Sequence, residues 1–131
     1  MFLFINTAEE KKAVGLIKDK KLAAIIDFKR KFGKSEKILL AIDKLFKKNK
    51  IKFSNLSGVI VVTGPGRFSS LRAGVSTANA LAYGLDISIK GIKLDEFKDK
   101  NFSLVNFTRK IFLRVVFPFY GKEPNITIGK S

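Results

Sequence analysis

The residue types that carry most enzyme chemistry are scarce in this chain. None of its 131 residues is a histidine or a cysteine. The commonest general base and metal ligand is therefore missing, as are thiolate nucleophiles, disulfides and zinc–thiolate sites. A two-metal nuclease would need an acid in the first strand, but that strand ends on Asn6, and Glu9 and Glu10 follow it in a turn. A serine–lysine peptidase finds no support in the spacing of those residue types. We therefore expect no catalytic centre and no metal site.

One backbone motif has the character of an anion site. A Gly64-Pro65-Gly66 turn separates an apolar run from a helix predicted over Phe68–Tyr83. Glycine permits backbone angles closed to other residues and proline fixes its own φ, so we expect a sharp and stiff turn. A Walker A loop or a dinucleotide fingerprint would need glycine at the position of Ser69. What remains is a helix N-terminus, which attracts anions in general, and we expect no bound cofactor.

The helix after this turn carries two stripes of side chains. An apolar stripe at helical spacing is suited to pack on the chain's own sheet, and comprises Phe68, Leu71, Val75, Ala78 and Ala82. A second stripe is made of small residues, namely Ala73, Thr77, Ala80 and Gly84. Either both stripes are buried in one domain, or the second receives a helix of another subunit. Gly74→Trp separates the two interpretations, since it should block pairing in the second and unfold the chain in the first.

The remaining pattern predicts an α/β domain. Three strands form an antiparallel meander, and two helical crossovers with two further strands follow, so the sheet should be mixed. The predicted strands are Phe2–Asn6, Ala13–Lys18, Leu22–Phe28, Val59–Thr63 and Ile87–Gly91. The other helix spans Ser35–Asn49, with Ile38, Leu39, Ile42, Leu45 and Phe46 on one face. The order β-β-β-α-β-α-β is that of the ribonuclease-H-like half of the actin-like fold.

The last forty residues carry a weaker pattern than the rest of the chain. We predict a short helix over Lys93–Lys100, a strand over Ile111–Phe117 and a hairpin partner at Asn125–Ile128. We divide the chain into a domain of residues 1–97 and a C-terminal part, residues 98–131, that ends in a β-hairpin; the family resemblance described below implies that this part is the remnant of a second lobe.

The net charge of +15, from 26 basic and 11 acidic residues, raises the expectation of nucleic-acid contact. The plainer interpretation is a lysine-rich solvated surface. Aromatic Phe32 and Phe53 are either base-stacking platforms or core residues. No apolar run approaches a membrane span and the start lacks a signal peptide's charge, so we expect a cytoplasmic protein without membrane contact. The candidate RNA contacts are Lys34, Lys37, Lys44, Lys47 and Lys48.

The central segment resembles the TsaB family, the small partner subunit of the bacterial machinery that makes threonylcarbamoyladenosine in tRNA. The family's turn-and-helix motif is similar to residues 64–72, its Ala-Leu-Ala-Tyr-Gly-like helix end to residues 80–84, and its next strand end to residues 90–94. Residues 4–8 and 34–40 resemble the start of the family's first strand and first helix. The resemblance covers residues 1–97. Asn6 and Lys34 stand where the family has Asp and His, and Arg67 and Ser70 where it has Ser and Gly.

The resemblance implies a pseudoenzyme, since TsaB proteins are similar to the catalytic subunit TsaD but lack its metal-binding histidines. It implies docking onto a TsaD-like subunit, or onto a second copy, through the helices that follow the meander and the Gly-Pro-Gly turn. It also admits a TsaE-like ATPase as a partner and indirect contact with tRNA. A free-standing RNA-binding module or a homodimeric scaffold is the alternative. The implied interface residues are Leu39, Ile42, Phe46, Gly64, Pro65, Gly66, Phe68, Ser69, Arg72, Ala73, Gly74, Thr77 and Ala80.

Overall fold

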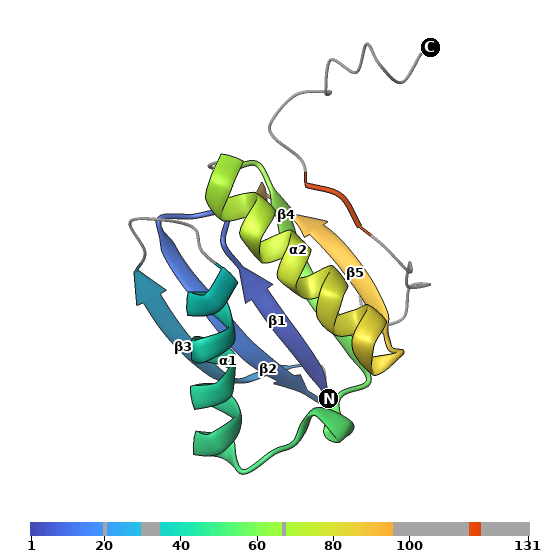
Figure 1. Ribbon diagram of the computed structural model, residues 1–131. Coiled ribbons are helices and arrows are strands. Elements are labelled where there is room, and N and C mark those ends of the chain that lie inside the picture. Colours follow the sequence, from blue (N-terminus) through green and yellow to red (C-terminus); the bar gives the residue numbers. More distant parts are fainter. Residues whose placement is uncertain (20, 30–34, 67, 96–115, 119–131) are drawn as a thin grey trace.

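The chain folds into one mixed β-sheet with two helices lying side by side on the same face (Figure 1). The structure, a computed structural model, describes residues 1–19, 21–29, 35–66, 68–95 and 116–118. The strand order is β3-β2-β1-β4-β5, so the first strand lies at the centre of the sheet. The strands are β1 (Phe2–Asn6), β2 (Lys11–Lys18), β3 (Lys21–Lys29), β4 (Gly58–Gly64) and β5 (Ser88–Lys93); the helices are α1 (Ser35–Asn49) and α2 (Phe68–Leu85), with a 3-10 turn η1 (Phe53–Asn55).

The sheet confirms the predicted mixture of pairings. β1 pairs antiparallel with β2, and β2 pairs antiparallel with β3, which is the expected meander. β4 pairs parallel with both β1 and β5, because α1 and α2 carry the chain back across the sheet between these strands. The predicted order of elements is therefore confirmed.

β1 has the predicted bounds, and the other four strands are longer than their apolar patterns predicted; β5 also begins one residue later than the predicted Ile87–Gly91. β2 begins at Lys11, which pairs with Lys29, and the turn between the two strands is closed by the pair Lys18 and Lys21. Backbone hydrogen bonding continues past the last apolar side chain, so charged residues extend both strands. Helix α2 likewise continues two residues beyond Tyr83, to Leu85.

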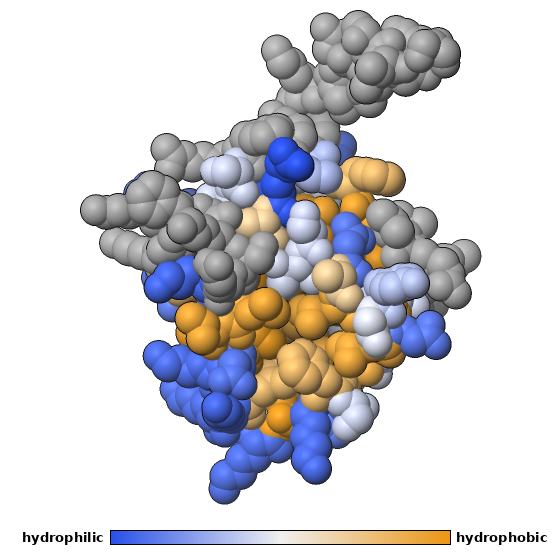
Figure 2. All heavy atoms as spheres, viewed as in Figure 1, coloured by the Kyte–Doolittle hydropathy of each residue, from blue (hydrophilic) through white to orange (hydrophobic). Residues whose placement is uncertain are grey.

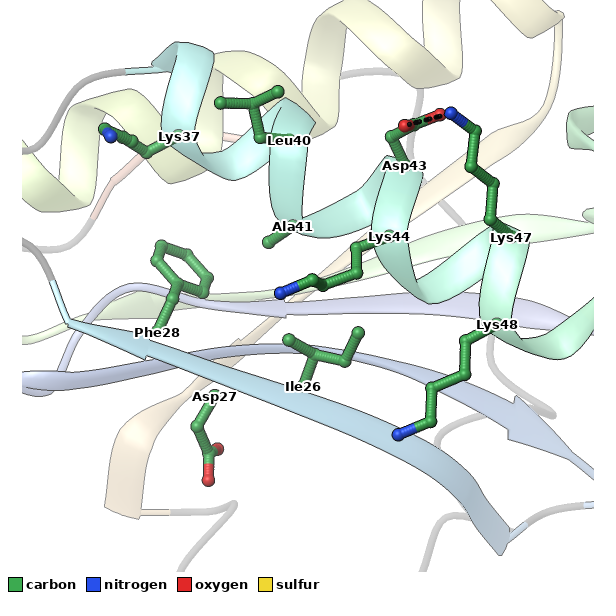
Figure 3. Close-up of a pocket in the computed structure, with 10 residues that line it drawn as sticks. All are labelled: Ile26, Asp27, Phe28, Lys37, Leu40, Ala41, Asp43, Lys44, Lys47 and Lys48. Atoms are coloured by element: carbon green, nitrogen blue, oxygen red, sulfur yellow. Dashed lines mark ion pairs between the residues drawn. The ribbon is translucent and has the colours of Figure 1, made fainter.

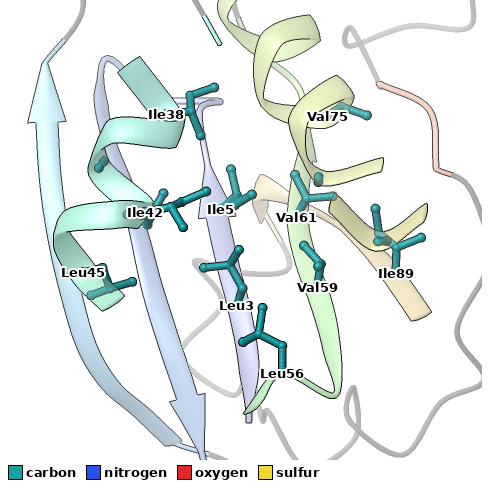
Figure 4. Close-up of a cluster of buried hydrophobic side chains, with 14 of the residues drawn as sticks. Leu3, Ile5, Ile38, Ile42, Leu45, Leu56, Val59, Val61, Val75 and Ile89 are labelled. Atoms are coloured by element: carbon teal, nitrogen blue, oxygen red, sulfur yellow. The ribbon is translucent and has the colours of Figure 1, made fainter. Parts of the chain in front are cut away.

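The main core lies between the sheet and the two helices (Figure 4). β1 and β4 contribute from the centre of the sheet, and side chains of both helices meet them. Because neighbouring strand residues point to opposite faces, β1 and β4 also supply a smaller cluster on the other face, with Phe4 and Ile60. The main cluster includes Leu3, Ile5, Ile38, Ile42, Leu45, Val59, Val61, Val75 and Ile89.

Helix α1 shows one error in the predicted apolar face. Ile38, Ile42 and Phe46 are buried as expected, but 45% of Leu39 is exposed. Successive helical residues are rotated by about 100°, so with Ile38 and Ile42 facing the sheet, Leu39 turns outward. Ala41 completes the buried face instead.

The small stripe of α2 is divided between the core and the surface. Ala73 and Thr77 are buried, and the Thr77 hydroxyl donates a hydrogen bond to the Ala73 carbonyl at 2.7 Å. Gly74 lies against Thr7, where an added Cβ would overlap the threonine hydroxyl. Gly74 therefore faces its own chain, and its prediction as a docking position is wrong. Gly84 has open space beside it, and Ala80 is exposed.

The C-terminal predictions fall mostly outside the described residues. The described end of the predicted strand, Val116 and Phe117, is not in a strand. Asn79 of α2 instead holds Val116 by two hydrogen bonds, donating to its carbonyl at 2.8 Å and accepting from its N–H at 3.0 Å. Lys93 belongs to β5, so the predicted Lys93–Lys100 helix begins one residue early; Leu94 and Asp95 are helical, and its residues from 96 on lie outside the described ranges. The hairpin at Asn125–Ile128 and the division at residue 98 lie outside them too. Neither described helix has the length and apolar character to cross a membrane.

Candidate partner interface

The Gly-Pro-Gly turn is fixed by contact with the turn that joins β1 to β2. Gly64 has a φ of 131°, which side chains rarely permit, as predicted for this position. Gly66 is required for a different reason, since an added Cβ would lie 2.6 Å from the Ala8 carbonyl oxygen. The Asn6 carboxamide shapes the opposing turn by accepting a hydrogen bond from the Ala8 N–H at 3.0 Å. These contacts set where α2 begins.

Asn6 thus has a structural task. Its side chain is 4% exposed and closes a local turn. The neighbouring Thr7 hydroxyl is buried and finds no hydrogen-bond partner among the described residues. Among all the residues that the structure describes, no group of three or more acidic, histidine or cysteine side chains is arranged to hold a metal ion.

The outward face of α1 and α2 exposes large apolar side chains. Leu39 is 45% exposed, Leu40 62% and Tyr83 87%. Figure 2 shows hydrophobic side chains gathered over the two helices, with hydrophilic ones around them. We call Leu39, Leu40, Ala80 and Tyr83 the helix-face patch. Exposed apolar clusters of this kind typically mark contact surfaces.

Part of the predicted interface belongs to the chain's own core. Within the described fold, five of the predicted residues pack inward and are withdrawn from the surface, namely Ile42, Phe46, Ala73, Gly74 and Thr77. Gly64 is also buried, and the Phe68 side chain lies outside the description. The predicted residues that are exposed are Leu39, Pro65, Ser69, Arg72 and Ala80.

Sequence reasoning missed Leu40 and Tyr83. Two consecutive leucines in a helix cannot both face the same narrow core, which was a usable signal for the first. Tyr83 lies outside both predicted stripes of α2. A residue on neither stripe points away from both predicted packing surfaces, so its position was a usable signal that the ring is exposed. The helix-face patch therefore takes one predicted leucine, one predicted alanine and two residues that the pattern overlooked.

Four of the candidate RNA-contact lysines line a groove beside α1, and Figure 3 shows Lys44 and Lys48 reaching toward β3 while Lys47 turns away to Asp43. Lys37, Lys44, Lys47 and Lys48 are exposed there, and Lys47 forms an ion pair with Asp43 at 3.1 Å. Lys34 lies outside the described residues.

The two candidate base-stacking aromatics fare differently. The Phe53 ring packs on the Phe46 ring with centroids 4.7 Å apart, so Phe53 is held against the core. Phe53 is nevertheless 40% exposed, so it lies at the margin of the core rather than inside it. Phe32 lies outside the described residues.

Comparison with known proteins finds similarity in the same central segment. Residues 33–94 match the family model described as TsaD, tRNA N6-adenosine threonylcarbamoyltransferase. The tRNA N6-adenosine threonylcarbamoyltransferase of Geotalea daltonii (strain DSM 22248 / JCM 15807 / FRC-32) is 40% identical over 57 residues, which make up 44% of this chain and 17% of that protein. The protein of the same name from Geobacillus thermodenitrificans (strain NG80-2) is 29% identical over 106 residues, covering 69% of this chain and 31% of that protein. The chain thus spans less than a third of these relatives' length.

Solved structures with the same fold include YeaZ from Pseudomonas aeruginosa. Its TM-score is 0.63 at 17% identity, over 70% of this chain and 42% of that one. A second structure, titled an uncharacterized protein with similarity to peptidase YEAZ from Pseudomonas aeruginosa, has a TM-score of 0.66 at 16% identity, over 76% and 48% of the two chains. The fold class is therefore the predicted ribonuclease-H-like, actin-like one.

Proposed function

We propose that this chain is a non-catalytic partner subunit in the tRNA threonylcarbamoyladenosine system. In this proposal it docks onto a TsaD-like transferase through the helix-face patch and supports that enzyme. The resemblance to TsaB and the matches to transferases of this modification support the assignment to the system.

The observation that carries the docking role is the exposure of large apolar side chains on both helices of one face. Leu40 and Tyr83 are each more than half exposed, although aliphatic and aromatic side chains gain free energy on leaving water, about 25 cal/mol per Å² of apolar surface. A standard interface buries roughly 800 Å² of each partner. Two adjacent helices of 15 and 18 residues supply a surface of that scale.

The chemistry of the chain supports an accessory role. It contains no histidine, so it has no counterpart to the metal-binding histidines that the resemblance attributes to TsaD. The position of the family's first-strand acid is taken by Asn6, which holds a turn. Activity of the complex would then depend on groups that the partner contributes.

Co-purification with the host's TsaD-like subunit, followed by determination of the complex mass, tests the proposal. We expect a complex of the two different chains. Transfer of the threonylcarbamoyl group, or RNA cleavage, by the purified chain alone after mock and metal controls would refute the non-catalytic role.

The same measurement separates the alternatives. A mass of two identical chains, with no transferase bound, favours a homodimeric scaffold. A free-standing RNA-binding module, suggested by the charge of +15, predicts binding of tRNA by the isolated chain with no need of a partner.

A further inference from the structure

Strand β3 is a long apolar edge of the sheet. It spans nine residues, contains no proline, and lies at the end of the strand order, next to β2 only. Among the described residues, none pairs with its outer side. Ile25 is 47% exposed on the sheet face away from the helices, and Leu22 is 43% exposed. Edge strands recruit other strands through their free N–H and C=O groups, and bulges and charges oppose this. β3 has a register irregularity beside Leu22, and its internal charge, Asp27, is paired with Lys11, so the stretch of residues 24–28 is the part suited to pairing.

A groove of about 810 Å³ runs between β3 and α1 (Figure 3). Its apolar lining comes from Ile26 and Phe28 of β3 and from Leu40 and Ala41 of α1. Figure 3 shows the side chains of Lys44 and Lys48 reaching from α1 toward β3.

The groove is electropositive because its two acids already have partners. Asp27 pairs with Lys11 at 3.3 Å, and Figure 3 shows its side chain on the sheet face opposite α1. Asp43 pairs with Lys47 at 3.1 Å. Within the described ranges, no carboxylate forms an ion pair with Lys37, Lys44 or Lys48, which also line the groove.

From this arrangement we propose that β3 and the groove bind an acidic, extended segment of another protein, which adds to the sheet as a further strand. The segment's backbone pairs with the free edge of β3, as in other cases of strand addition. Its side chains alternate between the two faces. Acidic residues on the α1 side reach Lys44 and Lys48, while β-branched residues on the other side pair with Ile25.

Charge argues against a second copy of this chain as the occupant. Each copy carries +15, so pairing two β3 strands would join two chains of high like charge. Like charges opposite each other on paired strands are destabilising. RNA fits the lysines but has no peptide backbone to pair with the edge of β3. This inference does not depend on the proposed function: Leu40 borders both the helix-face patch and the groove, but the strand pairing uses the β3 edge and the contacts tested are those of Lys44 and Lys48.

The test uses a fluorescent synthetic peptide of the length of β3 in which Glu and Val alternate. We expect saturable binding to the full chain, and no binding by a peptide with Lys in place of every Glu. Lys44→Glu/Lys48→Glu should weaken binding by about tenfold or more. The matched control Lys50→Glu makes the same charge change at an exposed residue outside the groove, and should alter affinity by less than about twofold. Lys44→Gln/Lys48→Gln keeps the assay valid if the glutamates disturb the helix end.

Two further probes test the strand geometry. Two peptides are made, one N-methylated at the odd-numbered residues and one at the even-numbered residues. Because alternate N–H groups of a strand point to opposite edges, each peptide loses the donors of one edge only. We expect one methylation pattern to abolish binding and the other to retain it. Equal binding of both methylated peptides, unchanged affinity in the lysine variants, or tighter binding of a single-stranded RNA oligomer that the acidic peptide fails to displace would each overturn the proposal.

Discussion

Gly74 and Gly84 lie on the same helix but in opposite surroundings. A Cβ on Gly74 would overlap Thr7, whereas a Cβ on Gly84 would meet open space. Gly74→Ala should therefore destabilise the chain by about 1–3 kcal/mol through overpacking, although alanine is the better helix former by about 1 kcal/mol. Gly84→Ala should be neutral or stabilising by up to about 1 kcal/mol. Urea unfolding of both variants measures the difference, and Gly74→Trp should prevent folding.

A double-mutant cycle identifies the cause of the Gly74 effect. Thr7→Ala removes the hydroxyl that the new methyl group would meet, so Thr7→Ala/Gly74→Ala should recover most of the loss, a coupling of about 1 kcal/mol or more. Additive free energies of unfolding would show that Thr7 is not the obstacle.

Asn79 replaces a backbone partner for Val116. Its carboxamide both donates to and accepts from that residue, as a paired strand would. Asn79→Ala removes two hydrogen bonds and should lower the free energy of unfolding by about 1–3 kcal/mol. Asn79→Asp keeps the acceptor and loses the donor, so its effect should be smaller. Hydrogen exchange at the Val116 amide should accelerate more in the alanine variant; equal rates would contradict the contact.

At the scale of elements, the helix-face patch predicts which substitutions weaken association with the TsaD-like subunit and which do not. Leu39 is 45% exposed on the helix face, and Ile25 is 47% exposed on the opposite face of the sheet. Because the two side chains are almost equally exposed, a substitution at Ile25 is a suitable control for the same substitution at Leu39. Leu39→Glu should weaken association with the TsaD-like subunit by about tenfold or more, because it buries a charge in an apolar contact. Ile25→Glu should leave association unchanged.

Sedimentation or pull-down with the transferase measures both variants of this pair. Circular dichroism should show that both remain folded, since neither side chain is buried. An equal loss of association in the two variants would remove the helix-face patch as the docking surface.

Local pattern predicted the elements well and the surface poorly. Two signals are local in the sequence: the β-branched run of β4 and the helical spacing of Ile38, Ile42 and Leu45. The sequence alone therefore indicates a buried strand and an amphipathic helix. Burial of Gly74 depends on Thr7, which is distant in the sequence and reaches it only in the folded sheet. The exposure of Leu39 likewise depends on how α1 sits on the sheet, which the sequence pattern leaves open.

At the scale of the whole molecule, charge separates the two views of tRNA contact. A chain of +15 binds tRNA through counterion release, so its affinity should fall steeply with salt if the isolated chain is an RNA module. As a partner subunit, the chain should show weak binding alone and tighter binding once the transferase is present. Titration of salt against tRNA affinity, with and without that subunit, measures this. A steep slope for the isolated chain, unaffected by the partner, would favour the RNA module.

The position of β1 in the sheet bears on how the chain matures during translation. β1 is synthesised before β4, which is one of its two neighbours in the sheet and begins only at Gly58. Before β4 is made, the edge of β1 that carries Leu3 and Ile5 has no strand to pair with, even if β1, β2 and β3 have already formed their meander. Exposed strand edges of this kind aggregate. Arrival of the Gly58–Gly64 segment is thus the moment at which synthesis yields a protected product, and a stall before it would leave a substrate for chaperones.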